Sequence, residues 1–238
     1  MVFHKYKTIF VHIPKAAGQS VEAYFLALEG LKWSERLPLL LTPNDAPNIG
    51  PPRLAHLQLQ EYLDNLYVSD ELYKDYFKFG FVRNPWSRTV SFYKFHGHHH
   101  LMSFEKFVNK ALPKLIKTEG WFYGPQYDFF YRDGKNEADF IGRFETIQKD
   151  FEYVCGQLDI PFTGLPHRNK SVEKGGVAGL KRFGNRFLHR PQALPALLFK
   201  KGDTIKSKNF RDYYTPELVE KVRALYPKDV EAFDYSFE

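Results

Sequence analysis

The sequence predicts an α/β fold in which a central parallel sheet is covered by helices on both faces, a three-layer α/β/α arrangement. Short apolar runs rich in β-branched and aromatic residues, at 7–13, 76–82 and 139–144, are typical of buried strands. Each run is followed by a segment with apolar residues at helical spacing. With 238 residues, 43% of them hydrophobic, the chain is long enough to bury such a core as a single domain, 1–238.

The first strand is predicted at residues 7–13, which end at a proline and a turn of small residues. The next helix is indicated by Val21, Phe25 and Leu28, which share one helical face. Five prolines lie within 37–53, so this stretch is predicted to be a surface loop. A helix is expected to follow at 55–66.

The second strand, 76–82, ends at Arg83, and Asn84 and Pro85 suit the N-cap and first position of a helix that should extend to about residue 96. The third strand, 139–144, is followed by a predicted helix at 145–158. A last helix is expected to begin after Thr215 and to end at Pro227.

Positive charge is concentrated in one segment. Residues 174–206 contain eight lysines and arginines against one aspartate, a surplus larger than the formal net charge of +6 of the whole chain. The segment is therefore predicted to be a basic insertion that contacts an acidic polysaccharide or the surface of an anionic membrane, or is merely solvated. Nucleic acid is not an expected partner, because no recognised binding module is present.

The compartment is predicted to be cytoplasmic. No run of 18 apolar residues suits a membrane span, and the first residues enter a strand pattern without a signal-peptide core. The single cysteine, Cys155, lies in an apolar helical pattern and is predicted to be a buried thiol.

The stretch HIPKAAGQS, residues 12–20, has the parts of an anion cradle. Lys15 supplies a compact charge, Gly18 removes a Cβ where backbone must approach a ligand, and Ser20 offers a hydroxyl in the first helical turn. It is not a Walker A loop, because the lysine precedes the glycine. An ordinary strand-to-helix turn with a surface lysine is the alternative.

A second anion motif lies in FGFVRNPWSRTVSFY, residues 79–93. Arg83 stands at the carboxyl end of a strand, and Ser91 follows about two helical turns later. An arginine fork and a hydroxyl suit one terminal phosphate. A structural salt bridge of Arg83 is the alternative.

Together the two motifs resemble those of the carbohydrate sulfotransferase family, in particular its bacterial members and the heparan sulfate 2-O-sulfotransferase branch. The stretches FIGRFE (140–145) and LPHRNKS (165–171), and the C-terminal end of the chain, are also similar. The resemblance implies a P-loop NTPase-like α/β/α fold. It also implies transfer of a sulfuryl group from 3′-phosphoadenosine 5′-phosphosulfate to a carbohydrate hydroxyl, without a metal.

Position by position, the resemblance implies that Lys15 contacts the sulfate and the bridging oxygen, and that Arg83 and Ser91 hold the 3′-phosphate. The residues expected around the 5′-phosphate are Ala16, Ala17, Gly18, Gln19 and Ser20. Ala16 and Gln19 stand where relatives usually have threonine, so donor affinity is expected to be weaker by about one hydrogen bond each.

The general base is predicted to be His56, because the resembling enzymes place a catalytic histidine upstream of the second motif. Glu22 is the fallback base, and Glu145 is expected to pair locally. His12 is expected to be structural. The cluster His96, His98, His99 and His100 is interpreted as an acceptor-facing or solvated loop.

Two other functions remain compatible with the sequence. A nucleotide-dependent phosphotransferase would need a G-K-[ST] loop and a strand-end aspartate for Mg²⁺, and neither stands in a convincing context. A glycan- or nucleotide-binding protein that lost catalysis would explain Ala16 and Gln19. The acceptor and the oligomeric state stay open.

Overall fold

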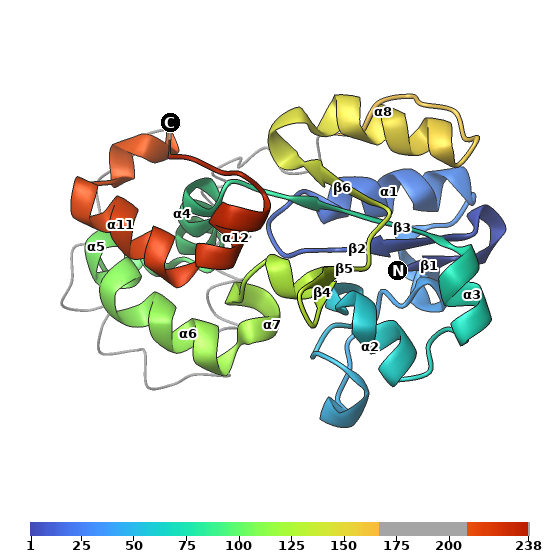
Figure 1. The fold of residues 1–238 in the computed structure, drawn as a ribbon, viewed down its shortest axis with the longest axis horizontal. Helices are drawn as coiled ribbons and strands as arrows, with labels where there is room; N and C mark the ends of the chain where they lie inside the picture. Colours follow the sequence, from blue (N-terminus) through green and yellow to red (C-terminus); the bar gives the residue numbers. More distant parts are fainter. Residues whose placement is uncertain (167–208, 238) are drawn as a thin grey trace.

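The computed structural model describes residues 1–166 and 209–237 (Figure 1). The predicted basic insertion at 174–206 lies outside the described residues, as does most of the stretch 165–171. Within the described part, a four-stranded sheet has the order β1-β2-β3-β6. Its strands are β1 (Val2–Phe3), β2 (Thr8–Val11), β3 (Phe77–Val82) and β6 (Phe140–Arg143).

The three predicted strands are confirmed as neighbours in one mostly parallel sheet. β3 is central and pairs in parallel with β2 and with β6, so that Val11 lies opposite Gly80 and Val82 opposite Arg143. The edge strand β1 pairs antiparallel with β2, and the sequence did not predict it. A small hairpin of β4 (Tyr131–Arg132) and β5 (Lys135–Asn136) stands apart from the sheet.

Helices cover both faces of the sheet, as predicted. Alternating strand side chains divide between two apolar clusters. On one face Phe10, Phe79 and Phe81 pack against α1 (Gly18–Leu28) and α8 (Ile147–Gln157). On the other face Ile9 and Val11 join a cluster that includes residues of α2 (Leu59–Asp64), α3 (Asp70–Asp75) and α4 (Pro85–Phe95). The P-loop NTPase-like form of this fold stays a prediction.

The remaining helices gather beyond the carboxyl end of β3, at the left of Figure 1. They are α5 (Phe104–Lys106), a π-helical turn (Phe107–Ala111), α6 (Leu112–Thr118), α7 (Gly120–Tyr123), α11 (Pro216–Leu225) and α12 (Pro227–Ala232). Thr215 caps α11 as predicted. Pro227 does more than end that helix, because it occupies the first position of α12.

The start of one helix differs from prediction, and the start of another agrees with it. Residues 54–56 form a 3-10 turn, so α2 begins only at Leu59. The side chain of Asn84 accepts hydrogen bonds from the N–H groups of Trp86 and Ser87, which confirms the predicted cap and start of α4.

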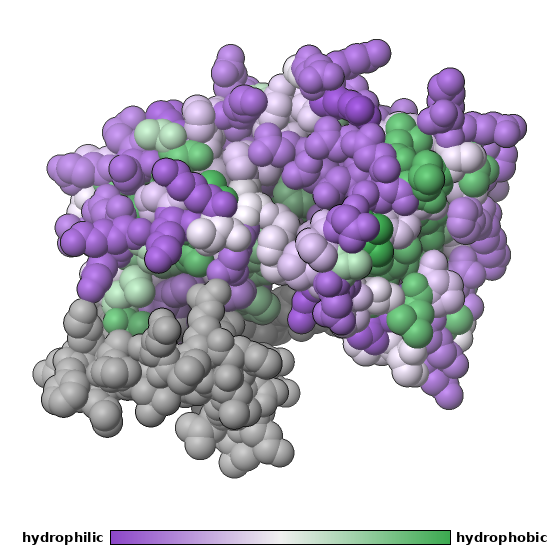
Figure 2. Space-filling view, turned by 90° about the horizontal axis from the view of Figure 1, so that it is seen from below, coloured by the Kyte–Doolittle hydropathy of each residue, from purple (hydrophilic) through white to green (hydrophobic). Residues whose placement is uncertain are grey.

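Most of the face shown in Figure 2 is hydrophilic, with smaller separate hydrophobic areas. No helix among the described residues is long and apolar enough to cross a membrane.

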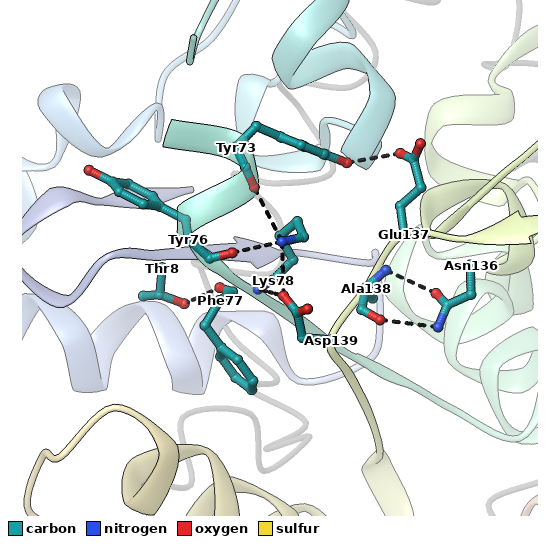
Figure 3. A network of polar contacts seen from close by, with 9 residues as sticks. All are labelled: Thr8, Tyr73, Tyr76, Phe77, Lys78, Asn136, Glu137, Ala138 and Asp139. Carbon is teal, nitrogen blue, oxygen red and sulfur yellow. Dashed lines mark hydrogen bonds and ion pairs between the residues drawn. The ribbon is translucent and has the colours of Figure 1, made fainter. Parts of the chain in front are cut away.

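The amino end of β3 is fixed by a buried lysine (Figure 3). Lys78 Nζ donates to the carbonyl oxygens of Tyr76 and Tyr73, at 2.7 and 3.2 Å, and lies 2.9 Å from Asp139 Oδ2. The same carboxylate oxygen accepts from the Lys78 backbone N–H. The Lys78 side chain therefore ties α3 to the start of β6.

Replacing Lys78 by methionine should lower the free energy of unfolding by about 1–3 kcal/mol, because buried carbonyl oxygens lose their donor. Urea denaturation measures this loss. Lys149→Met, on an exposed position of α8, is the matched control and should change stability by less than about 0.5 kcal/mol. Equal stability of the two variants would contradict a supporting role for Lys78.

Candidate functional site

The loop between β2 and α1 is tight and presents backbone donors at a helix N-terminus. Lys15 and Ala17 both adopt left-handed backbone conformations, with φ of 69° and 65°. Ala17 is the N-cap residue of α1 and makes no side-chain cap. Among the described residues, none accepts from the N–H groups of Ala17 and Gly18. These amides point to a place for an anion.

Not every predicted loop amide is available in this way. The Ala16 N–H donates to Ile13 O at 3.3 Å, and the Ser20 N–H donates to Ala17 O at 2.9 Å. Gln19 is exposed at the start of α1. The Ala16 side chain is only 2% exposed and packs in the apolar core, so a hydroxyl at this position would not face solvent.

Gly18 is required by His12. A Cβ on Gly18 would lie 1.8 Å from His12 Cδ2, so the imidazole fills the space next to the glycine. His12 Nδ1 is 2.5 Å from Glu22 Oε1, and both side chains are buried. The predicted structural role of His12 agrees with this geometry, and Glu22, the fallback base, is engaged with it.

The two predicted anion motifs lie side by side, because β2 and β3 are parallel neighbours. Arg83 Nη1 donates to Lys15 O at 3.2 Å. The other guanidinium nitrogens reach Ser87, with Nε and Nη2 at 3.0 and 2.8 Å from its Oγ. The arginine fork therefore joins the first loop to the first turn of α4.

Ser87 is a site residue that the sequence analysis missed. It contacts Arg83, whereas Ser91 lies one turn further along α4 and makes no hydrogen bond to the guanidinium. Positions 87 and 91 share one face of the helix. The spacing could have revealed this contact. Ser87 follows the strand-end Arg83 by four residues and therefore lies in the first turn of the helix that Asn84 caps, within reach of the arginine side chain.

Lys15 and Arg83 form no ion pair with any described acidic residue. Burial and then the charge of Arg83 lower the pKa of Lys15 to about 8. Burial, with a smaller effect of Arg88, lowers the pKa of Arg83 to about 10, although Glu145 acts in the opposite direction. Two cations held close together without a partner carboxylate favour an anionic ligand.

Aromatic rings flank both cations. Lys15 Nζ lies 3.7 Å from the ring centre of Phe95, and the Arg83 guanidinium carbon lies 4.2 Å from that of Phe144. Phe95 is 54% exposed and stacks on Phe122. The Lys15 ammonium therefore rests against the ring of a half-exposed phenylalanine.

A second arginine of the 79–93 motif supports the loop from inside. Arg88 is 1% exposed, and its Nε donates to Pro14 O at 3.0 Å. Its Nη1 and Nη2 donate to Gly124 O and Phe122 O, at 2.9 and 3.4 Å. Three carbonyl groups from two segments thus share one buried cation.

His56 lies against the same loop. Its Nδ1 is 2.8 Å from the carbonyl oxygen of His12. A carbonyl can only accept, so Nδ1 carries the proton and Nε2 keeps its lone pair. Burial, reinforced by His12, lowers the pKa of His56 well below its ordinary value. The ring lies beside Trp121 and Phe122, so His56 is a neutral imidazole at the aromatic side of the site.

Comparison with known proteins decides the family. The model of the sulfotransferase family matches residues 1–236. The chain belongs to the sulfotransferase family. A protein of Archaeoglobus fulgidus, described only as uncharacterized, is 32% identical over 98 residues, which cover 40% of this chain and 77% of that protein. No solved structure matches.

The family assignment supports sulfuryl transfer as the reaction of this sulfotransferase.

The histidine cluster at 96–100 contacts aromatic rings, with His96 against Phe122 and His98 against Phe107. Within 1–166 and 209–237, no group of three or more potential ligands is placed to hold a metal ion. Cys155 is buried, as predicted.

The prediction that Glu145 pairs locally was wrong, because its two partners lie 61 and 90 residues away in the sequence. Its Oε1 accepts from the Asn84 N–H and its Oε2 accepts from Tyr235, both at 2.9 Å. Gln126 is a fully buried polar residue, and its side chain is hydrogen-bonded to the backbone of Arg83. The sequence analysis assigned no role to Gln126.

Gly18→Ala should destabilise the sulfotransferase by about 1–3 kcal/mol, since the new Cβ must displace the His12 ring from its place beside Glu22. Gly156→Ala is the control, because its Cβ would meet nothing within 4 Å in α8 and should be neutral or stabilising by up to about 1 kcal/mol. Chemical denaturation of both variants measures the difference. A Gly18→Ala variant as stable as the wild type would show that the ring does not fix this loop.

Proposed function

We propose that this sulfotransferase moves a sulfuryl group from 3′-phosphoadenosine 5′-phosphosulfate to a carbohydrate hydroxyl. The observation that carries the proposal is the contact between Lys15 and Arg83, two cations without a described carboxylate partner at adjacent strand ends. The donor is anionic at both ends of its nucleoside, and a phosphate monoester carries about −1.5 to −2 charges at neutral pH. Two neighbouring cationic groups, Lys15 and Arg83, fit that charge pattern.

In this proposal the loop holds the 5′ end and Arg83 holds the 3′ end. The N–H groups of Ala17 and Gly18, with Lys15, face the phosphosulfate, while Arg83 faces the 3′-phosphate. Ser87 and Ser91 offer hydroxyl groups on the same face of α4. Ala16 contributes packing rather than a side-chain bond, so its departure from threonine leaves the available backbone donors in place.

The chemistry assigns one task to His56 and one to Lys15. His56 Nε2 takes the proton of the acceptor hydroxyl as its oxygen forms a bond to sulfur. The bond between sulfur and the phosphate oxygen breaks at the same time, and Lys15 stabilises the charge that develops on that oxygen. Adenosine 3′,5′-bisphosphate and the sulfated acceptor leave.

A sugar acceptor is supported by the rings beside the proposed base. Trp121 and Phe122 lie next to His56, and Phe95 stacks on Phe122. Trp121 and Phe95 are partly exposed, and exposed aromatic rings suit the apolar faces of sugar rings. The proposal also places the protein in the heparan sulfate 2-O-sulfotransferase-like branch. For residues 174–206 it assigns either an acidic polysaccharide or the surface of an anionic membrane as the partner.

Calorimetry with adenosine 3′,5′-bisphosphate, ADP and ATP tests the donor. We expect the bisphosphate to bind tightest, and Arg83→Ala to weaken its binding by roughly 10- to 150-fold, the value of a charged hydrogen bond of about 1.5–3 kcal/mol. Arg132→Ala is the control, because Arg132 is exposed and pairs with Asp64. Preference for ATP would indicate a phosphotransferase instead.

Transfer of labelled sulfate to a panel of glycans then separates an enzyme from a binding protein. His56→Asn should reduce turnover by about 10²- to 10⁴-fold while the bisphosphate still binds. A wild-type protein that binds the nucleotide but sulfates none of the glycans would favour the catalytically weakened binder.

The pH dependence of kcat/KM for the donor should report the protonation of Lys15. The free enzyme needs the protonated ammonium, and its pKa is lowered to about 8, so kcat/KM for the donor should fall as the pH rises through about 8. Because burial lowers the pKa of His56, the acid limb that reports this base should lie below the ordinary histidine value of about 6.5. Lys15→Arg should move the alkaline limb to higher pH. An alkaline limb that stays at the same pH in Lys15→Arg would assign it to another group.

A further inference from the structure

The side chain of Gln126 forms hydrogen bonds with both the N–H group and the carbonyl group of Arg83. Its Oε1 accepts from the Arg83 N–H, and its Nε2 donates to the Arg83 carbonyl oxygen, both at 2.8 Å. Arg83 directly follows the last residue of β3. The side-chain amide therefore extends the sheet by one residue, as a neighbouring strand would.

The orientation of this amide is fixed by a second buried side chain, Asp229 of α12. Both side chains are 0% exposed. Asp229 Oδ2 accepts from the backbone N–H of Gln126 at 3.0 Å and from its Nε2 at 3.2 Å, while Oδ1 accepts from the Tyr127 N–H at 2.9 Å. A carboxylate accepts and does not donate, so Nε2 must face Asp229 and Oε1 must face the Arg83 N–H.

The position of the Arg83 guanidinium depends on the position of the Arg83 backbone. The guanidinium donates its hydrogen bonds to Ser87 Oγ and to Lys15 O, both of which belong to the proposed donor site. A shift of the Arg83 backbone would move the fork relative to Ser87 and to the loop. Displacements of about 1 Å at such sites cost on the order of 10²-fold in function.

We infer that Gln126, oriented by Asp229, is a positioning residue that aims Arg83 at the 3′-phosphate and so sets the preference for nucleotides that carry one. The inference rests on the donor proposed above. Gln126 should therefore affect the binding of adenosine 3′,5′-bisphosphate more than that of ADP, because ADP has no 3′-phosphate and needs only the Lys15 loop.

The test compares the affinities for adenosine 3′,5′-bisphosphate and ADP by calorimetry in Gln126→Met, which keeps the volume and removes all three side-chain hydrogen bonds. We expect bisphosphate affinity to fall by roughly tenfold or more, and ADP affinity to change by less than about threefold. Gln157→Met is the matched control, since Gln157 is exposed at the end of α8. Its affinity ratio should equal that of the wild type.

Asp229→Asn provides a second variant if Gln126→Met does not fold. An asparagine cannot accept from all three N–H groups, so the ratio should fall in the same direction. An unchanged ratio in a folded Gln126→Met or Asp229→Asn protein, or an equal loss of both nucleotides, overturns this inference alone. A wild type without preference for the bisphosphate overturns the proposed donor, and this inference with it.

Discussion

The arrangement of the site depends on one contact, the hydrogen bond from Arg83 Nη1 to Lys15 O. It exists because β2 and β3 are parallel neighbours whose carboxyl ends meet at the same edge of the sheet. This bond joins two cationic residues. Burial, and to a smaller extent the charge of Arg83, lowers the pKa of Lys15, so the charged ammonium is held there at a cost in free energy. The rings of Phe95 and Phe144 lie against the two cations, and no described carboxylate forms an ion pair with either of them.

A layer of buried polar groups behind the cations makes that costly arrangement rigid. Arg88 ties the loop at Pro14 to the turn at Phe122 and Gly124, and Gln126 with Asp229 ties the end of β3 to α12. These side chains are almost fully buried, and each of their nitrogen and oxygen atoms has a hydrogen-bond partner, the condition under which a polar network stabilises one geometry. The helices at the left of Figure 1 therefore serve the site without supplying its charges.

The sequence revealed most of what depends on local chemistry. The strands followed from their apolar runs, and Asn84 with Pro85 located the start of α4 because a cap is a property of adjacent residues. Lys15 and Arg83 were found because each follows a strand. Gln126 and Asp229 were not found, since they are 103 residues apart and Gln126 lies in an aromatic run without helical or strand periodicity. The edge strand β1 was missed because two residues are too few to show alternation.

His12 connects the loop to the proposed base. Its ring lies against Gly18 and bonds Glu22, while its carbonyl oxygen holds the Nδ1 proton of His56. The backbone of His12 fixes the tautomer of the base, and its side chain fixes the glycine that opens α1. A displacement of this residue would therefore disturb the proton acceptor and the anion loop together. The loop and the base form one unit at the end of β2, although they are more than 35 residues apart in the sequence.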